Sequence, residues 1–329
     1  MRVRHEMNAQ RFSGCILGLL LATCTALSIA TAAAWPERPV RIIIPWPPGG
    51  STDIVGRILA ADLTPRLKQQ VLIDNRAGAA SIVGLQLATA SPPDGYTFMM
   101  TSTAYGFLID KPKVPVDLVN SFAPVAMIGF GESALVVHPS FPVKTIRDLI
   151  ELAKKRPGEI LYSSSGIGGF PHMNTALFEL KTGVKMVHVP FKGGGPAIAD
   201  VVAGHSQINF GSLVTVLPHV QSKRLRLVAT GGPKRNPKHP NVPAIAETVP
   251  GYESQIWWGI FAPPKTPASI IARFHEETTR VISTPAFEKR LDEQGGAVVK
   301  MSSAEFGKLM VSEQNKWLEV IRVAGIKGE

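Results

Sequence analysis

Apolar and polar positions along this chain predict short buried strands that lead into helices. The first such unit has a continuous apolar run at Val40–Ile44, a Gly-rich corner at Pro45–Asp53 and an amphipathic run at Ile54–Leu67. A continuous apolar run is typical of a strand buried on both faces. The backbone N–H groups of a Gly-rich corner that opens a helix point at one spot, together with the positive end of the helix dipole. This unit therefore predicts a site for an anion.

The same unit recurs in the first third of the chain. Val71–Ile73 precedes a polar loop at 74–81 and a helix that runs through Leu87, and Tyr96–Met100 leads into a loop of hydroxyl residues. Because the predicted strands alternate with helices, we expect a parallel sheet whose loops gather at one edge.

A second series follows a predicted helix at Thr145–Arg156, and its strands again end in Gly, Ser or Thr. It comprises Ile160–Ser163 with a helix to Leu180, Val187–Pro190 with another helix after Gly195, Ile208–Phe210 before Gly211-Ser212, and Leu225–Ala229 before Thr230–Gly232. This repetition predicts a second α/β domain.

The last third of the chain is expected to return to the first domain. After a Pro-rich connection at 233–250, Ile256–Phe261 is predicted as a strand, and helices are predicted at 267–283, 287–294 and 303–323. We therefore predict a discontinuous first lobe at 35–135 and 253–329 and an inserted second lobe at 136–252. Facing strand-end loops are where open α/β sheets bind ligands.

Gly129–Ala134 matches a dinucleotide-binding fingerprint on paper. Such a fingerprint must open a helix, whereas here it lies between two β-like runs, Pro124–Ile128 and Ala134–Val137. We therefore predict a turn and a chain crossing between the domains at this point, and no nucleotide site.

The first 34 residues are predicted to be a secretory signal cleaved near Ala34. They have a basic start, an apolar stretch at Cys15–Ile29 and small residues before Trp35. The alternative, a membrane anchor, needs about 20 unbroken apolar residues. Both cysteines, Cys15 and Cys24, lie in this segment, so the mature chain would contain no thiol. Lipidation at Cys24 is disfavoured because Thr precedes it. These features predict a periplasmic protein.

The net charge of +10 falls to +8 when the signal, with three arginines and one glutamate, is removed. The basic residues are scattered, and their densest group, Lys234–His239, lies in a Pro-rich loop without stacking aromatic residues. This distribution favours a solvated surface that attracts small anions over a partner such as nucleic acid or a membrane.

Two Gly-rich loops, one in each domain, are the candidate halves of a ligand site. Glycine lets the backbone approach a ligand closely, and a carboxylate can accept several hydrogen bonds from such loops at once. The candidate ligand-binding residues are Trp46, Pro48, Gly49, Gly50, Ser51, Thr52, Asp53, Gly78, Ala79, Thr101, Ser102, Ser164, Ser165, Gly166, Gly168, His172, Phe191, Lys192 and Gly193.

Each of these residues also has an ordinary structural interpretation. The hydroxyl residues can be helix N-caps, Trp46 and Phe191 can be core, Lys192 can face water, and His172 can simply begin a helix. His188, in the middle of a predicted strand, is expected to be a packing residue.

Motifs for catalysis, metals and cofactors are weak. The sequence Gly204–Ile208 fails the nucleophile-elbow pattern at its last position and precedes a strand. His275-Glu276 lacks the second histidine of a zinc helix, and no Walker loop is present. Asp53, at a helix start, is stabilised as a carboxylate and is a poor general base. We predict no catalytic residue, metal or cofactor.

Short motifs recur along the mature chain at Trp35–Arg41, Pro47–Asp53, Asn75-Arg76 with Gly78-Ala79, Pro92 with Asp94–Tyr96, Ser165–Gly168, Val189–Gly193, Pro250–Tyr252 and Ala262-Pro263. Together they resemble the Bug family, the extracytoplasmic receptors of tripartite tricarboxylate transporters. The resemblance covers nearly the whole mature chain. It implies a two-lobed periplasmic binding protein fold of type II that closes on small carboxylated solutes, and membrane permease subunits as partners.

Carried over by position, the resemblance places the first-lobe loop at Trp46–Asp53 and the second-lobe loop at Ser164–Gly168, with Phe191–Gly194 beside it. The chain departs from the family pattern at Trp46, where Phe is usual, and at Phe191, where Tyr is usual. Because both changes lie on the pocket side, they put the identity of the acid in question.

The function predicted from the sequence is therefore a monomeric receptor that binds a small organic acid by cleft closure and delivers it to a permease. Two alternatives stay open: a secreted hydrolase or isomerase that acts on similar acids, and a binding protein that signals to a membrane partner.

Overall fold

A computed structural model of the chain describes residues 35–78, 81–103 and 118–326. The chain divides into two units, Met1–Glu37 and Arg38–Glu329, and every element named below belongs to the second. The predicted signal segment, with both cysteines, lies outside the described residues.

The strands form one mixed sheet. Eight of them follow one another in the order β2-β1-β3-β9-β4-β7-β5-β6, and β8 and β10 each pair with β4. Their bounds are β1 (Val40–Ile44), β2 (Val71–Asn75), β3 (Thr97–Ser102), β4 (Ala123–Val137), β5 (Leu161–Ser164), β6 (Val187–Pro190), β7 (Ile208–Ser212), β8 (Arg226–Thr230), β9 (Gln255–Ala262) and β10 (Gly296–Val298).

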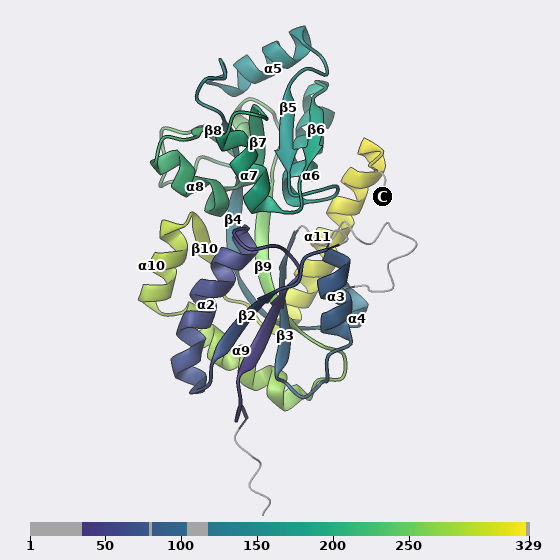
Figure 1. Ribbon diagram of the computed structural model, residues 1–329, viewed down its shortest axis with the longest axis vertical. Helices are drawn as coiled ribbons and strands as arrows, with labels where there is room; N and C mark the ends of the chain where they lie inside the picture. The colour runs from purple at the N-terminus through teal and green to yellow at the C-terminus, as the bar shows by residue number, and fades with distance from the viewer. Residues whose placement is uncertain (1–34, 79–80, 104–117, 327–329) are drawn as a thin grey trace, which may run out of the picture. The chain divides into compact units, whose positions relative to one another are not determined.

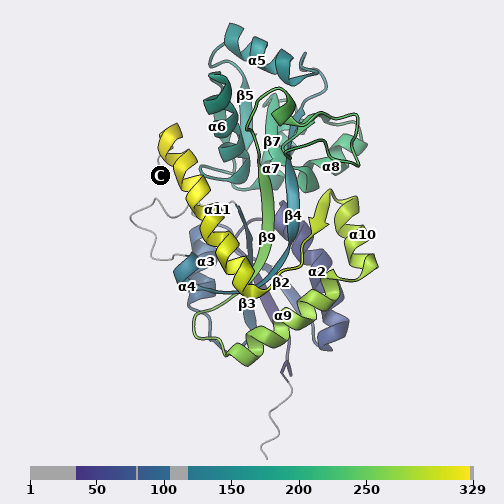
Figure 2. The same ribbon diagram turned by 180° about the vertical axis from the view of Figure 1, so that it is seen from behind.

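The long strand β4 belongs to two parts of this sheet. Its residues up to Glu132 pair with β9 and β10, and its residues from Ser133 pair with β7 and β8. We call the part built on β1, β2, β3, β9 and β10 lobe 1, and the part built on β5, β6, β7 and β8 lobe 2. Figures 1 and 2 show β4 and β9 side by side at the passage between the lobes.

The turn predicted at Gly129–Ala134 is wrong, because β4 runs without interruption through this segment. The two glycines that suggested a turn instead make room for neighbours in the sheet. A methyl group built on Gly129 would lie 2.2 Å from the carbonyl oxygen of Ala297, and one on Gly131 would lie 2.5 Å from the ring of Trp258. The chain does cross between the lobes here, as a strand that opens no helix.

The sheet is also not the purely parallel sheet that the βα alternation predicted. Neighbouring strands joined through helices are parallel, as in β1 with β2 and β3, and β5 with β6 and β7. The strands that carry the chain between lobes, β4 and β9, pair antiparallel with all their partners. A parallel arrangement needs a crossover connection between strands, whereas β4 runs from lobe 1 into lobe 2 and β9 returns beside it in the opposite direction.

The helices lie close to the predicted ranges. They are α2 (Ser51–Leu67), α3 (Ile82–Thr89), α4 (Leu118–Ser121), α5 (Ile146–Lys155), α6 (Phe170–Thr182), α7 (Gly194–Val202), α8 (Leu213–Gln221), α9 (Ala268–Ile282), α10 (Pro285–Glu293) and α11 (Ser303–Ala324). The helices α4 and α8 and the strand β10 were not predicted. In the part of the chain that the structure describes, no helix has the length and apolar character needed to cross a membrane.

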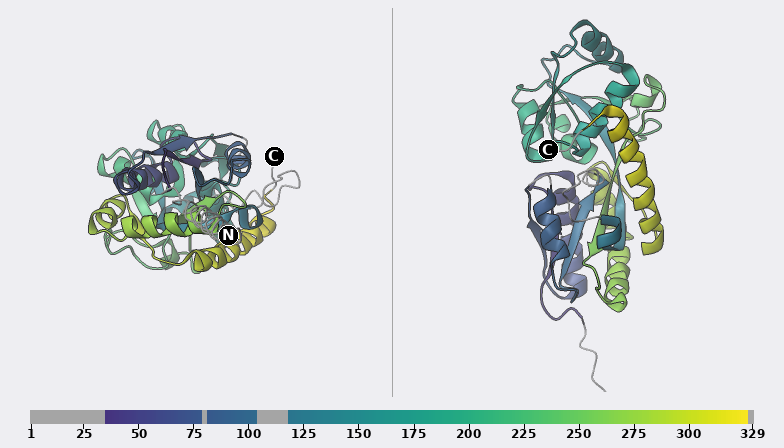
Figure 3. Two further views of the ribbon diagram at one scale, coloured as in Figure 1. Left: turned by 90° about the horizontal axis from the view of Figure 1, so that it is seen from below. Right: turned by 90° about the vertical axis from the view of Figure 1, so that its right-hand side faces the viewer.

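Separate clusters of buried side chains stabilise the two lobes. In lobe 1, Met99, Phe261 and Phe306 share one cluster, and in lobe 2, Tyr162, Phe178 and Phe210 share another. Helix α11 connects the lobes from outside, because it packs against β4 and α4 and also against α6 of lobe 2, as Figure 3 shows.

Candidate functional site

A cavity lies between the loops of the two lobes. The centres of water molecules could occupy about 50 Å³ of it. Lobe 1 contributes Trp46, Gly50, Ser51, Thr52, Ser102 and Ile256, and lobe 2 contributes Ser165, Phe170, Pro171, Gly194, Ile198, Asn209, Gly211, Ser212 and Thr215. None of these lining residues, all in the described part of the chain, is an Asp, Glu, Lys, Arg or His.

Four helices begin at this cavity. Helix α2 begins after Gly50, α6 after Gly169, α7 after Gly193 and α8 after Ser212, and at each of these N-caps no side chain bonds to the helix. Of the helices that do not line the cavity, α5, α10 and α11 are capped by the side chains of Thr and Ser residues, whereas α3 and α9 also have no side-chain cap. The first N–H groups of a helix have no partner within the helix, so these four helix starts leave donors available at the cavity.

The first loop is held in place by a network behind it. Asp53 Oδ2 accepts hydrogen bonds from the backbone N–H of Gly49 at 3.0 Å and from Arg57 Nε at 3.1 Å. Arg57 also donates to Asn75 Oδ1, and Asn75 Nδ2 donates to the carbonyl of Trp46 at 3.0 Å. Because Asp53 is occupied by these contacts, it shapes the loop and is not presented to the cavity.

The loops of the two lobes are in contact beside the cavity. A methyl group built on Gly193, which has a φ of +134°, would lie 2.3 Å from Pro47 Cγ. One built on Gly195 would lie 3.2 Å from the carbonyl oxygen of Pro48. Only a residue without a side chain allows the loop before α7 to approach the loop before α2 this closely.

The second loop, Ser164–Gly168, is supported by two stacked histidines. The rings of His172 and His188 are parallel within 4° and 4.1 Å apart. His172 Nδ1 accepts the backbone N–H of Gly168 at 2.9 Å, and His188 Nε2 lies 2.5 Å from Ser164 Oγ. Burial, and then the neighbouring His188, lowers the pKa of His172 to about 4, and burial lowers the pKa of His188 to about 4. Both rings are therefore neutral at pH 7.

Comparison with known proteins decides the family. The family model described as "Tripartite tricarboxylate transporter family receptor" matches residues 55–326 of this chain. The chain belongs to this receptor family. Protein BugT of Bordetella pertussis is 31% identical over 95% of this chain and 97% of its own length.

Solved structures confirm the two-lobed periplasmic binding protein fold of this receptor. The structure described as "R. palustris Rpa4515 with adipate" is similar to it with a TM-score of 0.86 and 31% identity, over 89% of this chain and 99% of that one. The periplasmic binding protein BugD is similar with a TM-score of 0.85 and 25% identity, over 90% of this chain and 100% of that one. The predicted resemblance to the Bug family is confirmed.

The structure brings part of the predicted site together. The predicted residues that line the cavity are Trp46, Gly50, Ser51, Thr52, Ser102 and Ser165. The loop residues Pro48, Gly49 and Gly193 lie in the contact between the lobes. The remaining described residues lie behind or outside the lining, and they are Asp53, Gly78, Thr101, Ser164, Gly166, Gly168, His172, Phe191 and Lys192. Ala79 lies outside the described residues.

The predicted residues of this receptor differ in their burial and in their place within the helices. Ser51 and Thr52 are inside the first turn of α2 and do not cap it, since Gly50 is the N-cap. Lys192 and Gly78 are exposed, and Thr101 is fully buried beside the lining residue Ser102. His188, predicted as a packing residue, is half-buried and does pack, in the stack with His172.

Sequence reasoning missed the contribution of β7 and α8. Asn209, Gly211 and Ser212 line the cavity. Gly211 and Ser212 are small residues after a predicted strand, which is the signal that the two predicted loops share, whereas Asn209 lies inside that strand and had no such signal. The apolar lining residues Phe170, Ile198 and Ile256 had no such signal, because an apolar side chain on a helix or strand is usually core.

Ser164 and His188 make the contact that a nucleophile and its base need, but Ser164 is fully buried and does not line the cavity. Within the described ranges, no group of three or more His, Cys, Asp or Glu side chains could hold a metal ion.

Proposed function

We propose that this receptor binds a small carboxylated organic acid in the cavity between its lobes and delivers it unchanged to a membrane permease. The observation that carries this proposal is the meeting of four helix starts, none capped by a side chain, at a cavity lined by no ionised residue. The adipate in the Rpa4515 structure, described above, is a carboxylated acid and supports the same ligand class.

The electrostatics of the cavity favour an anion. Each helix start carries about half a positive charge, so four of them provide about two charges without any basic side chain. Hydrogen bonds to a charged group contribute about 1.5–3 kcal/mol each, and several donors can be shared by one carboxylate. A positive side chain is therefore unnecessary for affinity, and the lack of one in the lining does not argue against an acidic ligand.

The proposal includes an exported, monomeric protein. The segment 1–34 would act as the signal and be removed near Ala34, lobe 1 would comprise 35–135 and 253–329, and lobe 2 would comprise 136–252. The contact of Gly193 with Pro47 is the contact that closure of two such lobes around a ligand would make. The receptor would then present its closed form to the permease.

A thermal-shift experiment with matched pairs tests the ligand class. The purified protein is heated with propionate or propionamide, succinate or succinamide, and benzoate or benzamide. Since a ligand that binds only the native state stabilises it by about 2.7 kcal/mol at 100 times its Kd, at least one acid should raise the Tm while its amide does not. Stabilisation by amides or neutral sugars alone would refute the carboxylate assignment.

A proline substitution tests the N–H donors at the start of α2. Pro is tolerated at the first position of a helix and removes one N–H, so Ser51→Pro at the start of α2 should lower the affinity for the best acid about tenfold or more. Ala268→Pro is the matched control, because Ala268 is the exposed first residue of α9 and does not line the cavity. Equal affinity of Ser51→Pro and the unchanged protein would contradict the proposed role of α2.

Mass spectrometry separates a receptor from an enzyme. The best acid is incubated with the protein and recovered, and a receptor returns it unchanged. A new product formed in proportion to protein and time would replace the receptor proposal with catalysis at the same cavity.

A further inference from the structure

The side chain of Asn209 has a fixed orientation at the cavity. Asn209 is fully buried on β7, and its Nδ2 donates to the carbonyl of Ser163 at 2.8 Å and to Ser163 Oγ at 3.0 Å. Turning the amide over would place its oxygen against the Ser163 carbonyl, which is also an acceptor. The contacts of Nδ2 therefore determine where Oδ1 points.

Asn209 Oδ1 is an acceptor for which the described residues supply no donor. It is buried and has no hydrogen-bond partner among them. The Ser163 hydroxyl cannot supply one, since it donates to the carbonyl of Ala197 at 2.9 Å. A methyl group built on Gly211 would lie 2.4 Å from this oxygen, so the missing side chain at Gly211 leaves room beside Oδ1, and both residues belong to the lining of the cavity.

The other polar groups of the cavity are suited to a carboxylate. The N–H groups of the helix starts are donors, and Trp46 Nε1, which is buried and has no partner within the described part of the chain, can only donate. A carboxylate accepts hydrogen bonds from all of these groups but offers nothing to Asn209 Oδ1. An acid without a donor group would therefore leave a buried acceptor unpaired, which weakens binding.

On the basis of the proposed function, we propose that the receptor selects acids that carry a hydroxyl group, and that Asn209 Oδ1 accepts the hydrogen bond from that hydroxyl. An ammonium group is also a donor, but it is disfavoured here. The lining contains no Asp or Glu to compensate a positive charge, and the four helix starts repel one. The apolar walls formed by Phe170, Ile198 and Ile256 suit the rest of the molecule.

Isothermal titration with matched triplets of ligands tests this selection. Each triplet contains a hydroxy acid, the same acid without the hydroxyl and the same acid with an amino group: lactate, propionate and alanine; malate, succinate and aspartate; mandelate, phenylacetate and phenylglycine. In the triplet that binds best, the hydroxy acid should bind at least about tenfold more tightly than both of its analogues.

Two variants assign the preference to Asn209. Asn209→Leu removes the acceptor and keeps the same branched arrangement of heavy atoms, and it should reduce the ratio of affinities between hydroxy acid and plain acid to about one. Asn174→Leu is the matched control, because Asn174 is equally buried and bonds to the Phe210 carbonyl but does not line the cavity. It should leave the ratio unchanged even if the protein becomes less stable.

The outcomes separate this inference from the function on which it rests. Binding of none of the carboxylates would overturn the proposed function. Equal binding of hydroxy and plain acids, or tightest binding of the amino acid, would overturn the selection while leaving a carboxylate receptor. A ratio that persists in Asn209→Leu would overturn the assignment to Asn209. If Asn209→Leu does not fold, the triplets measured on the unchanged protein still decide the selection.

Discussion

Acidification should destabilise this receptor through the stacked pair His172 and His188. The pKa of each ring is lowered from 6.5 to about 4, first by burial and, for His172, also by the positive charge that His188 would carry. Between pH 6.5 and pH 4 the unfolded chain therefore binds protons that the folded protein does not. Stability must then fall as the pH falls through this window, and above pH 6.5 the pair has no effect.

The size of the effect follows from the two pKa values. From pH 7 to pH 5, each histidine would cost about 1.8 kcal/mol of unfolding free energy if its ring were wholly buried. Both rings are half-buried, and solvent screening reduces the effect, so we expect a loss of about 2–3 kcal/mol for the pair. Glu132 and Glu179, whose pKa values are raised by burial, act in the opposite direction, because the folded protein takes up their protons first as the pH falls from neutral.

A comparison with non-titrating variants isolates the histidines. His172→Asn and His188→Gln can keep an acceptor near the N–H of Gly168 and near Ser164 Oγ. Urea unfolding at pH 7 and pH 5 should show a loss of stability that is smaller in each variant than in the unchanged protein, by about 1 kcal/mol or more. Between pH 8 and pH 7, the change in stability should be the same in the variants and in the unchanged protein, and this range serves as the control. An equal loss from pH 7 to pH 5 in all three proteins would refute the reasoning.

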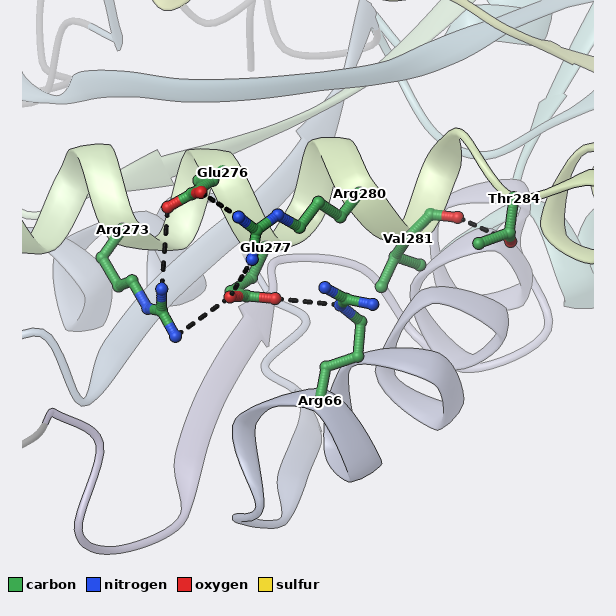
Figure 4. A network of polar contacts seen from close by, with 7 residues as sticks. All are labelled: Arg66, Arg273, Glu276, Glu277, Arg280, Val281 and Thr284. Atoms are coloured by element: carbon green, nitrogen blue, oxygen red, sulfur yellow. Dashed lines mark hydrogen bonds and ion pairs between the residues drawn. The ribbon is translucent and has the colours of Figure 1, made fainter.

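Two further substitutions test the loop contact and a buried carboxylate. Gly193→Ala should lower the ligand affinity at least about tenfold, because the new methyl group would collide with Pro47; Gly183→Ala, also at a positive φ but in open space, should cost stability and leave the affinity measured by titration calorimetry unchanged. Glu277→Gln should cost about 1–3 kcal/mol in urea unfolding, because the carboxylate of Glu277 is 3% exposed and contacts three arginines (Figure 4). Glu276→Gln, on the same helix and 48% exposed, should cost less than about 0.5 kcal/mol. An equal fall in ligand affinity in Gly183→Ala and Gly193→Ala would contradict the first account. An equal loss of stability in Glu276→Gln and Glu277→Gln would contradict the second.

Local sequence signals were sufficient for most elements of the fold. The apolar run Val40–Ile44 is β1, and the helix predicted at Thr145–Arg156 is α5, whose capping box joins Thr145 and Asp148. These signals depend only on residues within one turn or one strand, so they do not require knowledge of contacts with the rest of the chain. The continuous strand β4 was missed for the opposite reason, because the glycines in it serve contacts with Ala297 and Trp258 far along the chain.

The sequence by itself determined the alternation of strands and helices, the Gly-rich corner at Pro45–Asp53 and, through its motifs, the family. Only the tertiary structure decided what that corner faces. It placed the start of α2 opposite the starts of α6, α7 and α8 and set Asn209 among them. The physical reason is that a single helix start is a common and weak anion site, whereas the summed charge of four depends on distances between residues that lie far apart in the chain.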